Sequence, residues 1–483
     1  MAASAILRPP GPKSIPIFGR WNALVKFFRD PILFLNNLHQ QYGKIAAFTD
    51  NGSNWFAVFG PEGSGELLTH PDLFHSGSFP ETNLEDTALR RLGTGLLSME
   101  GSLHRQHRHF MQPYFHHQEV GAHHEDIIRS IEKMLDGWQL GAQRDICQDM
   151  HHLATTISIL SFFGITDEEE IKRLGLDAVR WIDLASSPSA QLFRVRVPLT
   201  AGSALYDLSE ELEAHYRLIV AQKREDLKSH HDILSSLLQA RDAGVFAVSD
   251  DQIIGQTHLL TLGGIDTFAN GMTWTLFLLD QYPGILADLS DEIDGVLRGA
   301  SPKLTDLQKM PLLERVIKES LRILPPLAYL LRKSVAPAIL LGFRVPQNAK
   351  ILYSPYVTHH LPDLYPMPER FYPDRWLNRD VPPFAYIPFG AGIHTCIGAN
   401  FAMMAMKLAI TMVVQRYRLH LVPGAQIDRY LPRFVLSSKQ GMPMTVHTRQ
   451  EKEPEPNRPQ GNIREMVEFL RLTPINLKHN RRR

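Results

Sequence analysis

Apolar residues in this 483-residue chain recur mostly at helical spacing, and the longest such run extends from Ile253 to Tyr282. Directly before it, Ser249, Asp250 and Asp251 offer side chains that can cap the first turn of a helix, and Pro283 follows its last residue. The pattern therefore predicts one long helix whose two ends are both marked in the sequence.

The central part of this run, Leu259 to Leu279, is long enough to cross a bilayer and carries one charge, that of Asp266. A membrane-spanning helix and a buried central helix are both compatible with this length. The charge in mid-helix, the adjacent Gly263 and Gly264, and the lack of a second run of this kind favour the buried helix.

Shorter patterns predict the rest of the architecture. Residues 20–48 predict an amphipathic helix followed by a turn at Tyr42-Gly43, and two strand-like runs, Ile45–Phe48 and Trp55–Phe59, flank a hairpin signal at residues 50–53. From about residue 100 to 450 the pattern is mostly helical, with short strands around 338–354 and 418–447. We therefore predict a mostly α fold with small β-sheets, in a single domain covering residues 1–450.

Residues 451–483 are predicted to form a linker and a short helical, basic tail. Glu451–Pro459 combines charges and prolines as solvated linkers do, and Ile463–Leu472 has the pattern of a short amphipathic helix. Two alternatives stay open for this tail. It is either frayed and without function, which its composition favours, or docked on the domain or on a partner.

Composition excludes several classes of function. The chain holds 51 basic and 51 acidic residues, a balance that gives no reason to expect a nucleic-acid partner. Two cysteines, Cys147 and Cys396, cannot build a disulfide framework and fit a reducing compartment, so we expect a cytoplasmic protein. We also expect it to be a monomer. The 22 histidines include adjacent pairs at 116–117, 123–124, 151–152, 230–231 and 359–360. Neighbours on a helix point in different directions, so such pairs are poor metal sites, and we interpret them as surface residues.

The segment Phe389–Gly398 (FGAGIHTCIG) sets Cys396 in surroundings suited to a thiolate ligand. Gly390 and Gly392 can adopt positive φ, which lets the backbone fold tightly around a sulfur atom. A helical run, Ile397 to about Arg416, follows, so the sulfur is predicted to lie at a helix N-terminus, where the dipole and the free amides favour the thiolate. An inert buried thiol is the alternative.

Phe389, Gly392, Cys396 and Gly398 match the spacing F-x-x-G-x-x-x-C-x-G, and in this the segment resembles the haem-binding loop of the cytochrome P-450 family. The resemblance implies the fold of that family, with haem b between the long distal helix and the cysteine-ligand loop. It also implies that Cys396 is the proximal ligand of the haem iron. A thiolate in that position pushes electron density onto iron and favours O–O cleavage.

Gly263-Gly264-Ile265-Asp266-Thr267, within the long helix, resembles the oxygen-binding motif of soluble bacterial members of the family. Two glycines are expected to leave one helix face bare, so that a flat cofactor can approach. The Thr267 hydroxyl and the Asp266 carboxylate can hold water and deliver protons. The alternative for both is local hydrogen bonding within the helix. Their presence favours activation of O2 with electrons supplied from outside.

Glu319 and Arg322 stand three residues apart on the helix predicted to begin at Pro311 and to end before the Pro325-Pro326 pair. This E-x-x-R spacing resembles the signature ion pair of the family, and the segment around Arg375 resembles the one that supplies its third member. The resemblance implies that these three residues form a structural triad that supports the haem pocket.

Haem propionates need cationic or hydrogen-bonding groups at the edge of the pocket. His104 and Arg108 lie four apart in a segment that resembles the propionate-binding helix of the family, and Arg332 follows the proline pair at the matching interval. His394 takes a place where the family usually has arginine, and it carries less charge near neutral pH. Solvated surface residues are the alternative for all of them.

By the same resemblance, the substrate pocket is lined by the loop from about residue 76 to 97 and by Leu262, Phe268, Leu327, Ala328 and Tyr329. The named residues are mainly apolar, as both a pocket for a hydrophobic substrate and an ordinary core would be. A fatty acid, a terpenoid and a steroid-like molecule are equally compatible with them.

These features together predict a haem-thiolate monooxygenase that hydroxylates or epoxidises a hydrophobic small molecule. Electrons are expected from NAD(P)H through separate proteins, such as a ferredoxin and its reductase. The run Pro9-Pro10-Gly11-Pro12 resembles the hinge that follows the membrane anchor in membrane-bound members of the family. The segment before it is too short to form such an anchor, so we expect no transmembrane segment. A non-catalytic haem sensor or carrier and a peroxide-driven oxygenase are the alternatives.

Overall fold

The long apolar run forms the central helix of the fold. α13 spans Asp250–Gln281 and is capped by Ser249, whose hydroxyl accepts from the Gln252 amide while the Ser249 amide donates to the Gln252 side chain. Most of its side chains are buried, so the prediction of a buried central helix is confirmed. Within the described ranges, no helix combines the length and the hydrophobicity that crossing a bilayer requires.

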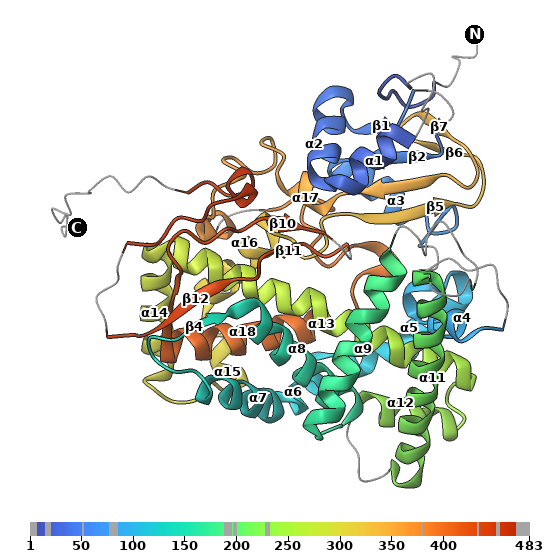
Figure 1. Cartoon of the computed structure of the whole chain (residues 1–483). Coiled ribbons are helices and arrows are strands. Elements are labelled where there is room, and N and C mark those ends of the chain that lie inside the picture. Colours follow the sequence, from blue (N-terminus) through green and yellow to red (C-terminus); the bar gives the residue numbers. More distant parts are fainter. Residues whose placement is uncertain are drawn as a thin grey trace.

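The protein is represented by a computed structural model (Figure 1). The structure describes residues 7–14, 21–50, 53–76, 86–187, 196, 200–227, 232–377, 380–431, 434–450 and 455–469. Besides α13, its helices are α1 (Trp21–Arg29), α2 (Pro31–Tyr42), α3 (Gly60–Thr69), α4 (Ala88–Leu92), α5 (Gly101–Met111), α6 (His117–Ala122), α7 (His124–Asp136), α8 (Ile146–Phe163), α9 (Glu168–Ser186), α11 (Ala201–Glu225), α12 (Ile233–Asp242), α14 (Pro283–Leu297), α15 (Leu304–Leu307), α16 (Pro311–Ile323), α17 (Pro355–His359) and α18 (Ala399–Arg416).

The strands form small sheets, as predicted. One sheet has the order β1-β2-β8-β5-β3, in which only the β2–β8 pair is parallel, and another has the order β4-β12-β9. β6 pairs with β7, and β10 pairs with β11. The bounds are β1 (Ile45–Ala47), β2 (Trp55–Val58), β3 (Phe74–His75), β4 (Gln143–Asp145), β5 (Leu330–Ser334), β6 (Ala338–Leu340), β7 (Phe343–Val345), β8 (Lys350–Tyr353), β9 (Tyr417–Leu421), β10 (Arg429–Tyr430), β11 (Ser437–Ser438) and β12 (Pro443–Thr448).

The amphipathic pattern at residues 20–48 forms two helices where one was predicted. The Asp30 carboxylate caps α2 by accepting from the Leu33 amide at 3.0 Å, and Pro31 occupies the first helical position. An acceptor followed by proline starts a new helix because proline supplies no amide to continue the old one. The predicted hairpin is confirmed, since β1 and β2 pair antiparallel.

The segment after residue 454 packs against the body of the protein. Ile463, Met466 and Val467 are buried in the same hydrophobic core as α13. The predicted helix at residues 463–472 is wrong in its described part, where a short 3-10 helix, η6 (Asn462–Glu465), is followed by non-helical chain. Its last residues, together with 451–454 and the basic end, lie outside the described ranges. For residues 455–469 the docked alternative therefore holds.

The interpretation of the histidine pairs as surface residues is wrong for several members. His123, His124 and His359 are buried, while His230 and His231 lie outside the described residues. A neutral imidazole has one donor and one acceptor, so it can be buried when backbone groups satisfy both. His359 shows this arrangement, because its Nδ1 contacts the Arg322 carbonyl and its Nε2 accepts from the Ile387 amide.

Burial of neutral histidines predicts loss of stability in acid. His258 on α13 is 2% exposed and packs against Trp181 and Tyr216, and burial lowers its pKa to about 3. Below pH 6.5 His258 takes up a proton in the unfolded chain but stays neutral in the folded chain. The free energy of unfolding therefore falls by about 1.4 kcal/mol for each unit by which the pH is lowered. Denaturant titrations of His258→Gln are expected to show a pH slope reduced by this amount between about pH 6 and 4. Exposed His152 is the control, and an equal slope change in His152→Gln would contradict this prediction.

Candidate haem-thiolate site

The cysteine loop is folded by glycines and by its own backbone hydrogen bonds. The Cys396 amide donates to the Phe389 carbonyl at 2.8 Å, and Gly390 and Gly392 have φ of 69° and 71°. A Cβ at Gly392 would lie 2.4 Å from the Leu68 carbonyl oxygen, so only glycine fits there. The prediction of a tight glycine-dependent loop is confirmed, and α18 follows the loop from Ala399.

Opposing electrostatic effects act on the sulfur of Cys396. Part of the Cys396 residue is accessible to solvent, while many protein atoms surround its sulfur. This enclosure raises the pKa of the thiol, while the Gly398 amide and the Arg108 guanidinium act in the opposite direction without cancelling it. The predicted effect of the helix N-terminus is present in the Gly398 amide, which lowers the pKa, but desolvation is the larger effect. Coordination to a metal ion is what deprotonates a thiol outright.

Helix α5 brings two predicted residues to the loop. Arg108 donates to the carbonyl of Thr395, next to Cys396, at 2.7 Å, and the rings of His104 and His394 lie 4.3 Å apart. His104 is 1% exposed, and neither ring nitrogen has a hydrogen-bond partner among the residues that the structure describes. Burial, aided by His394 and Arg108, lowers the pKa of His104 to about 4. An uncharged buried imidazole of this kind has a free N–H for an acidic ligand group.

Glu100 is a member of the site that sequence reasoning missed. Its carboxylate lies 3.2 Å from Nε2 of His394 and accepts from the Ser76 amide. Burial would raise the pKa of Glu100, but the His394 and Ser76 hydrogen bonds outweigh it and the pKa is lowered. His394 therefore has an acidic hydrogen-bond partner, in a place where the family usually has arginine.

Arg332 reaches the same loop through Tyr353. Arg332 lies on β5, is 5% exposed, and holds its guanidinium 5.6 Å from the centre of the Tyr353 ring. The Tyr353 hydroxyl lies 3.9 Å from the position that a Cβ on Gly390 would take. Pairing of β5 with β8 fixes this arrangement, because it sets Arg332 opposite Ile351, two residues before Tyr353.

The two glycines of α13 do not share a face, so the expectation of one bare face is wrong. Gly263 has no neighbouring atom within 4 Å of the point where a Cβ would lie, whereas a Cβ on Gly264 would lie 2.6 Å from Ser158 Oγ and 2.8 Å from Phe162. Consecutive helical residues point about 100° apart, so one glycine leaves open space and the other lets α8 pack closely. Ser158 also donates to the Gly264 carbonyl at 2.8 Å.

Asp266 and Thr267 have different partners. The Thr267 hydroxyl donates to the Gly263 carbonyl at 2.9 Å, so the local bond within the helix is present. A hydroxyl that donates in this way keeps its lone pairs as acceptors. Asp266 faces α8, where its carboxylate lies 3.4 Å from Nδ1 of His151. The His151 side chain is 26% exposed, so this pair connects the helix to solvent.

Phe162 on α8 connects the oxygen-side helix to the cysteine side. Its ring touches the Gly264 position, lies 5.2 Å from the Phe401 ring on α18, and lies 6.2 Å from Phe115. Phe115 in turn lies 3.9 Å from the position that a Cβ on Gly398 would take. Two motifs about 130 residues apart in sequence are thereby held across one aromatic cluster, which no sequence pattern indicated.

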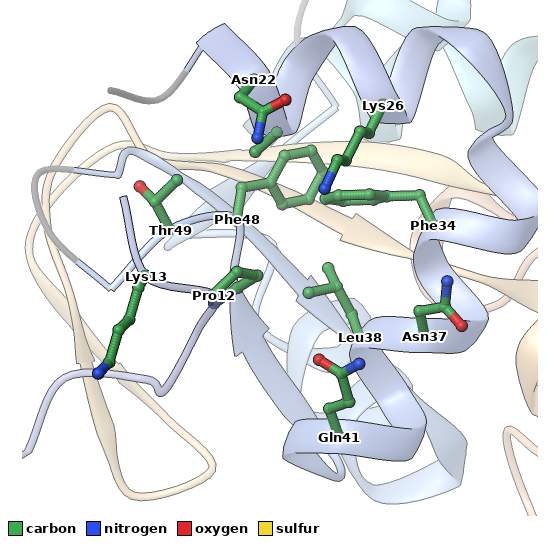
Figure 2. Close-up of a pocket in the computed structure, with 11 residues that line it drawn as sticks. Pro12, Lys13, Asn22, Lys26, Phe34, Asn37, Leu38, Gln41, Phe48 and Thr49 are labelled. Atoms are coloured by element: carbon green, nitrogen blue, oxygen red, sulfur yellow. The ribbon is translucent and has the colours of Figure 1, made fainter. Parts of the chain in front are cut away.

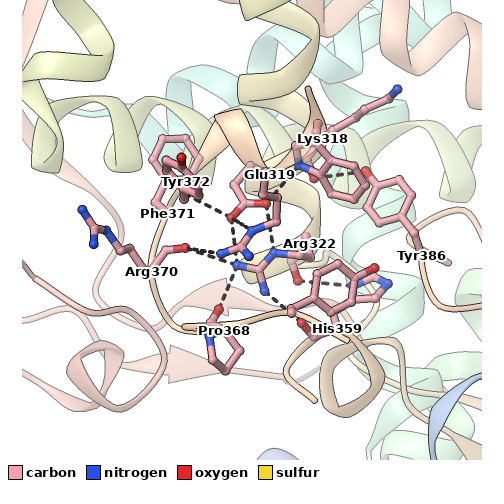
Figure 3. Close-up of polar contacts among 12 residues, drawn as sticks. Lys318, Glu319, Arg322, His359, Pro368, Arg370, Phe371, Tyr372 and Tyr386 are labelled. Atoms are coloured by element: carbon pink, nitrogen blue, oxygen red, sulfur yellow. Dashed lines mark hydrogen bonds and ion pairs between the residues drawn. The ribbon is translucent and has the colours of Figure 1, made fainter. Parts of the chain in front are cut away.

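The predicted triad forms one buried network (Figure 3). Arg322 binds Glu319 with two hydrogen bonds of 2.9 and 3.0 Å, and Arg375 binds the same carboxylate at 2.9 Å. The side chains of Glu319 and Arg322 are 0% exposed, and that of Arg375 is 5% exposed. The Tyr372 amide and the Trp376 indole also donate to Glu319. The carboxylate is thus fully satisfied, as a buried charge must be.

The triad is connected to the cysteine loop through His359. Arg322 donates to the His359 carbonyl at 2.8 Å, and Nε2 of His359 accepts from the Ile387 amide at 2.9 Å, two residues before Phe389. Because Nε2 accepts, the proton must be on Nδ1, which lies 3.2 Å from the Arg322 carbonyl. Burial and the Arg322 charge hold the pKa of His359 well below its usual value.

The predicted substrate-pocket residues come from α13 and from the segment after the proline pair, and they differ in burial. Phe268, Ala328 and Tyr329 are at most 5% exposed and belong to the hydrophobic core. Leu262 and Leu327 are partly exposed. Of the loop at residues 76–97, the part from 77 to 85 lies outside the described residues.

A cavity of about 300 Å³ lies elsewhere, in the N-terminal part of the fold (Figure 2). Phe34, Leu38 and Phe48 form its apolar wall, and Lys13 and Lys26 stand at its rim. None of the predicted site residues lines it, so we assign it no part in the chemistry of the cysteine loop.

The residues around the loop fit haem. Haem needs an axial donor to its iron, open space along its flat face and partners for its propionates. Accessible Cys396 can supply the axial donor, and Gly263 leaves open space on α13. Arg108 and His104, whose ring nitrogens have no described partner, can bind the propionates. In the described residues, no cluster of three or more His, Cys, Asp or Glu side chains could hold a metal ion. A metal at Cys396 would therefore need a ligand that brings its other donors, as a porphyrin does.

Comparisons with known proteins agree with this site. The chain is 30% identical to cyclooctat-9-en-7-ol 5-monooxygenase of Streptomyces melanosporofaciens, over 86% of this chain and 90% of that protein. It is 26% identical to pentalenene oxygenase of Streptomyces avermitilis, over 88% and 94% of the two chains. The structure of retinoic acid-bound cyanobacterial CYP120A1 superimposes with a TM-score of 0.79 at 24% identity, covering 92% of this chain and all of that one.

The chain also matches the model of a whole protein family. The cytochrome P-450 family model matches residues 9–444, which include every predicted site residue from His104 to Gly398. The fold, the cysteine loop and the buried triad agree with that match. The chain belongs to the cytochrome P-450 family and is a haem-dependent monooxygenase of that family.

Proposed function

We propose that this monooxygenase uses O2 to hydroxylate or epoxidise a terpenoid, with electrons supplied from NAD(P)H by separate redox proteins. The observation that carries the proposal is the combination of an accessible Cys396 with Thr267 and Asp266, which follow the open position of Gly263 by about one turn of α13. When bound, haem supplies the oxygen activation. The residues of the chain hold it, orient the substrate and deliver protons.

Thr267 is proposed to position a water molecule on the distal side. Its hydroxyl is fixed by donation to the Gly263 carbonyl, so its oxygen can accept a hydrogen bond from water in a defined direction. Gly263 leaves open space at the same turn, where a small ligand can lie beside the helix. A water held there can donate a proton onward without movement of the helix.

Asp266 is proposed to renew that proton. Its carboxylate is 9% exposed and faces the partly exposed imidazole of His151 at 3.4 Å. A partly exposed imidazole exchanges protons with solvent near neutral pH, and a neighbouring carboxylate accepts them. The supply of protons from solvent to Thr267 is thereby assigned to these two side chains of α8 and α13.

A terpenoid is the substrate class best supported. Both cited relatives are named for terpenoids, cyclooctat-9-en-7-ol and pentalenene. Two of the side chains assigned to the pocket, Leu262 and Leu327, are apolar and partly exposed, which suits a hydrocarbon skeleton with few polar groups. A fatty acid and a steroid-like molecule remain the alternatives, and a spin-shift screen with all three classes distinguishes them. A ferredoxin and its reductase are the proposed electron donors.

Replacing Thr267 by alanine tests the proton-delivery role. We expect product formed per NADPH consumed to fall by about 100-fold, with hydrogen peroxide released in its place, because general acid catalysis contributes at least that factor. Product, NADPH and peroxide are measured together, with a surrogate ferredoxin and reductase as donors. Thr273→Ala is the matched control, since Thr273 makes the same bond to its own helix, to Ala269 at 2.8 Å.

Three outcomes would contradict the proposal. Efficient turnover with hydrogen peroxide alone, unaffected by Thr267→Ala, would identify a peroxide-driven oxygenase. Substrate binding without product from any electron donor would identify a haem sensor or carrier. Unchanged coupling in Thr267→Ala with O2 would remove Thr267 from the mechanism.

A further inference from the structure

Residues 455–469, here called the C-terminal strap, follow the region matched by the family model and run against the body of the protein (Figure 1). The Gln460 amide donates to the Ala425 carbonyl at 2.8 Å, and the Ile427 amide donates to the Gln460 carbonyl at 2.9 Å. Beyond this point Ile463 and Met466 enter the core. The strap is thus held by both backbone pairing and burial.

Arg429 joins the strap to two other parts of the fold. It lies on β10, its side chain is 5% exposed, and its guanidinium bonds Glu465 of the strap and Asp30, the cap of α2, both at 2.6 Å. The Arg429 amide also donates to the Asn462 side chain at 2.7 Å. A buried guanidinium between two carboxylates is a fixed junction, because each ion pair satisfies a different edge of its fork.

The hairpin that begins at Arg429 ends against the proposed substrate wall. Its returning residues contact the segment after the proline pair, where Val435 forms a β-bridge with Leu327 and the Leu436 amide donates to the Pro326 carbonyl at 2.7 Å. The ring of Phe434 lies 5.8 Å from that of Tyr329. Leu327 and Tyr329 are two of the residues assigned to the substrate pocket.

We propose that the C-terminal strap is a positioning element for substrate, which acts through Arg429 to hold residues 434–436 against the Leu327–Tyr329 wall. The inference rests on the proposed function, because it assigns that wall to the substrate pocket. β10 and β11 are two residues long each, and so short a hairpin is not stable by itself in water. Its position, and with it the shape of the wall, is set by what anchors its base.

The test uses iron-binding azoles of two sizes, so it needs no knowledge of the substrate. Imidazole is too small to fill a substrate pocket beside the iron, whereas clotrimazole carries bulky aromatic rings that would fill it and touch the wall. In Arg429→Gln we expect the dissociation constant of clotrimazole to rise about tenfold and that of imidazole to stay within about twofold, because only the bulky ligand needs a preorganised wall. Difference spectra of the haem-loaded protein give both constants.

Arg449→Gln is the matched control. Arg449 binds Asp294 through two hydrogen bonds of 2.8 and 2.6 Å, and neither residue contacts the β10–β11 hairpin or the strap in the described hydrogen bonds and ion pairs. We expect both azole constants to be unchanged in this variant. Arg429→Lys retains one charged contact and is expected to recover part of the clotrimazole affinity. Amide exchange at Leu436 should speed up in Arg429→Gln and not in Arg449→Gln.

The outcomes separate this inference from the proposed function. Equal weakening of both azoles in Arg429→Gln, or the same effect in Arg449→Gln, would overturn the inference and leave the monooxygenase proposal intact. Failure of the parent protein to bind either azole at a haem iron would overturn both. If Arg429→Gln yields no haem-loaded protein, Glu465→Gln replaces it, because this variant removes only one partner of Arg429, whose side chain is 63% exposed. We expect a smaller rise in the ratio of the clotrimazole dissociation constant to the imidazole dissociation constant. An unchanged ratio in Glu465→Gln would overturn the inference.

Discussion

Replacing Cys396 with serine is expected to abolish oxygenation while the fold persists. Serine fills the same space, and the Cys396 amide bond to the Phe389 carbonyl does not involve the side chain, so the loop should keep its shape. A neutral hydroxyl cannot push electron density onto iron as a thiolate does. We expect product formation to fall below detection, and circular dichroism to show unchanged helix content.

Cys147→Ser is the matched control for this prediction. Cys147 lies in the first turn of α8, far in sequence from the loop, and it is also partly accessible. Its loss should leave product formation within about twofold, as surface-type substitutions usually do. Activity retained in Cys396→Ser, or lost equally in Cys147→Ser, would remove Cys396 from the role of axial ligand.

Replacing Glu319 with alanine is expected to destabilise the protein by about 3–5 kcal/mol, because it leaves two buried guanidinium groups without their shared counter-ion. Arg322 and Arg375 both bind this carboxylate, with side chains 0% and 5% exposed. The same substitution should release haem, since Arg322 positions His359 and through it the backbone at Ile387. Chemical denaturation and haem content per chain measure the two effects.

Glu314→Ala provides the comparison on the same helix. Glu314 pairs with Lys318 and Lys407, but its side chain is 43% exposed, and exposed ion pairs contribute at most about 1 kcal/mol. We expect this variant to keep its haem. An equal loss of stability in the two variants would show that the buried network has no special role.

The sequence predicted the elements that depend on local patterns. Ser249 and Pro283 mark the ends of α13 within a few residues, because a cap and a proline act on their immediate neighbours. Gly392 was identifiable because a tight loop around a ligand needs positive φ. The Glu319–Arg322 pair was identifiable because three residues on a helix bring two side chains together.

The sequence did not predict partners that only the tertiary fold brings together. Glu100 supports His394 across 294 positions of the chain, and Phe162 bridges two motifs from a third helix. Nothing in the residues around Glu100 or Phe162 indicates such contacts. The two glycines of α13 were wrongly given one face, although the helical period of 3.6 residues already places Gly263 and Gly264 on different sides.

The sulfur illustrates a different limit of sequence reasoning. A helix N-terminus favours a thiolate, and that effect is present as the Gly398 contribution to the pKa of Cys396. Desolvation by the surrounding protein, which the sequence does not display, is the larger effect and raises the pKa. The balance between two opposing effects requires the three-dimensional surroundings of the atom.

The central claim is that Cys396 binds haem iron as a thiolate, and the spectrum of the reduced, carbon monoxide-bound parent protein tests it most directly. We expect the red-shifted absorption band of a thiolate-ligated haem, absent from Cys396→Ser and retained in Cys147→Ser. A band of the imidazole-ligated type, which buried His104 or another histidine would give, would contradict the claim, as would a thiolate band that survives in Cys396→Ser.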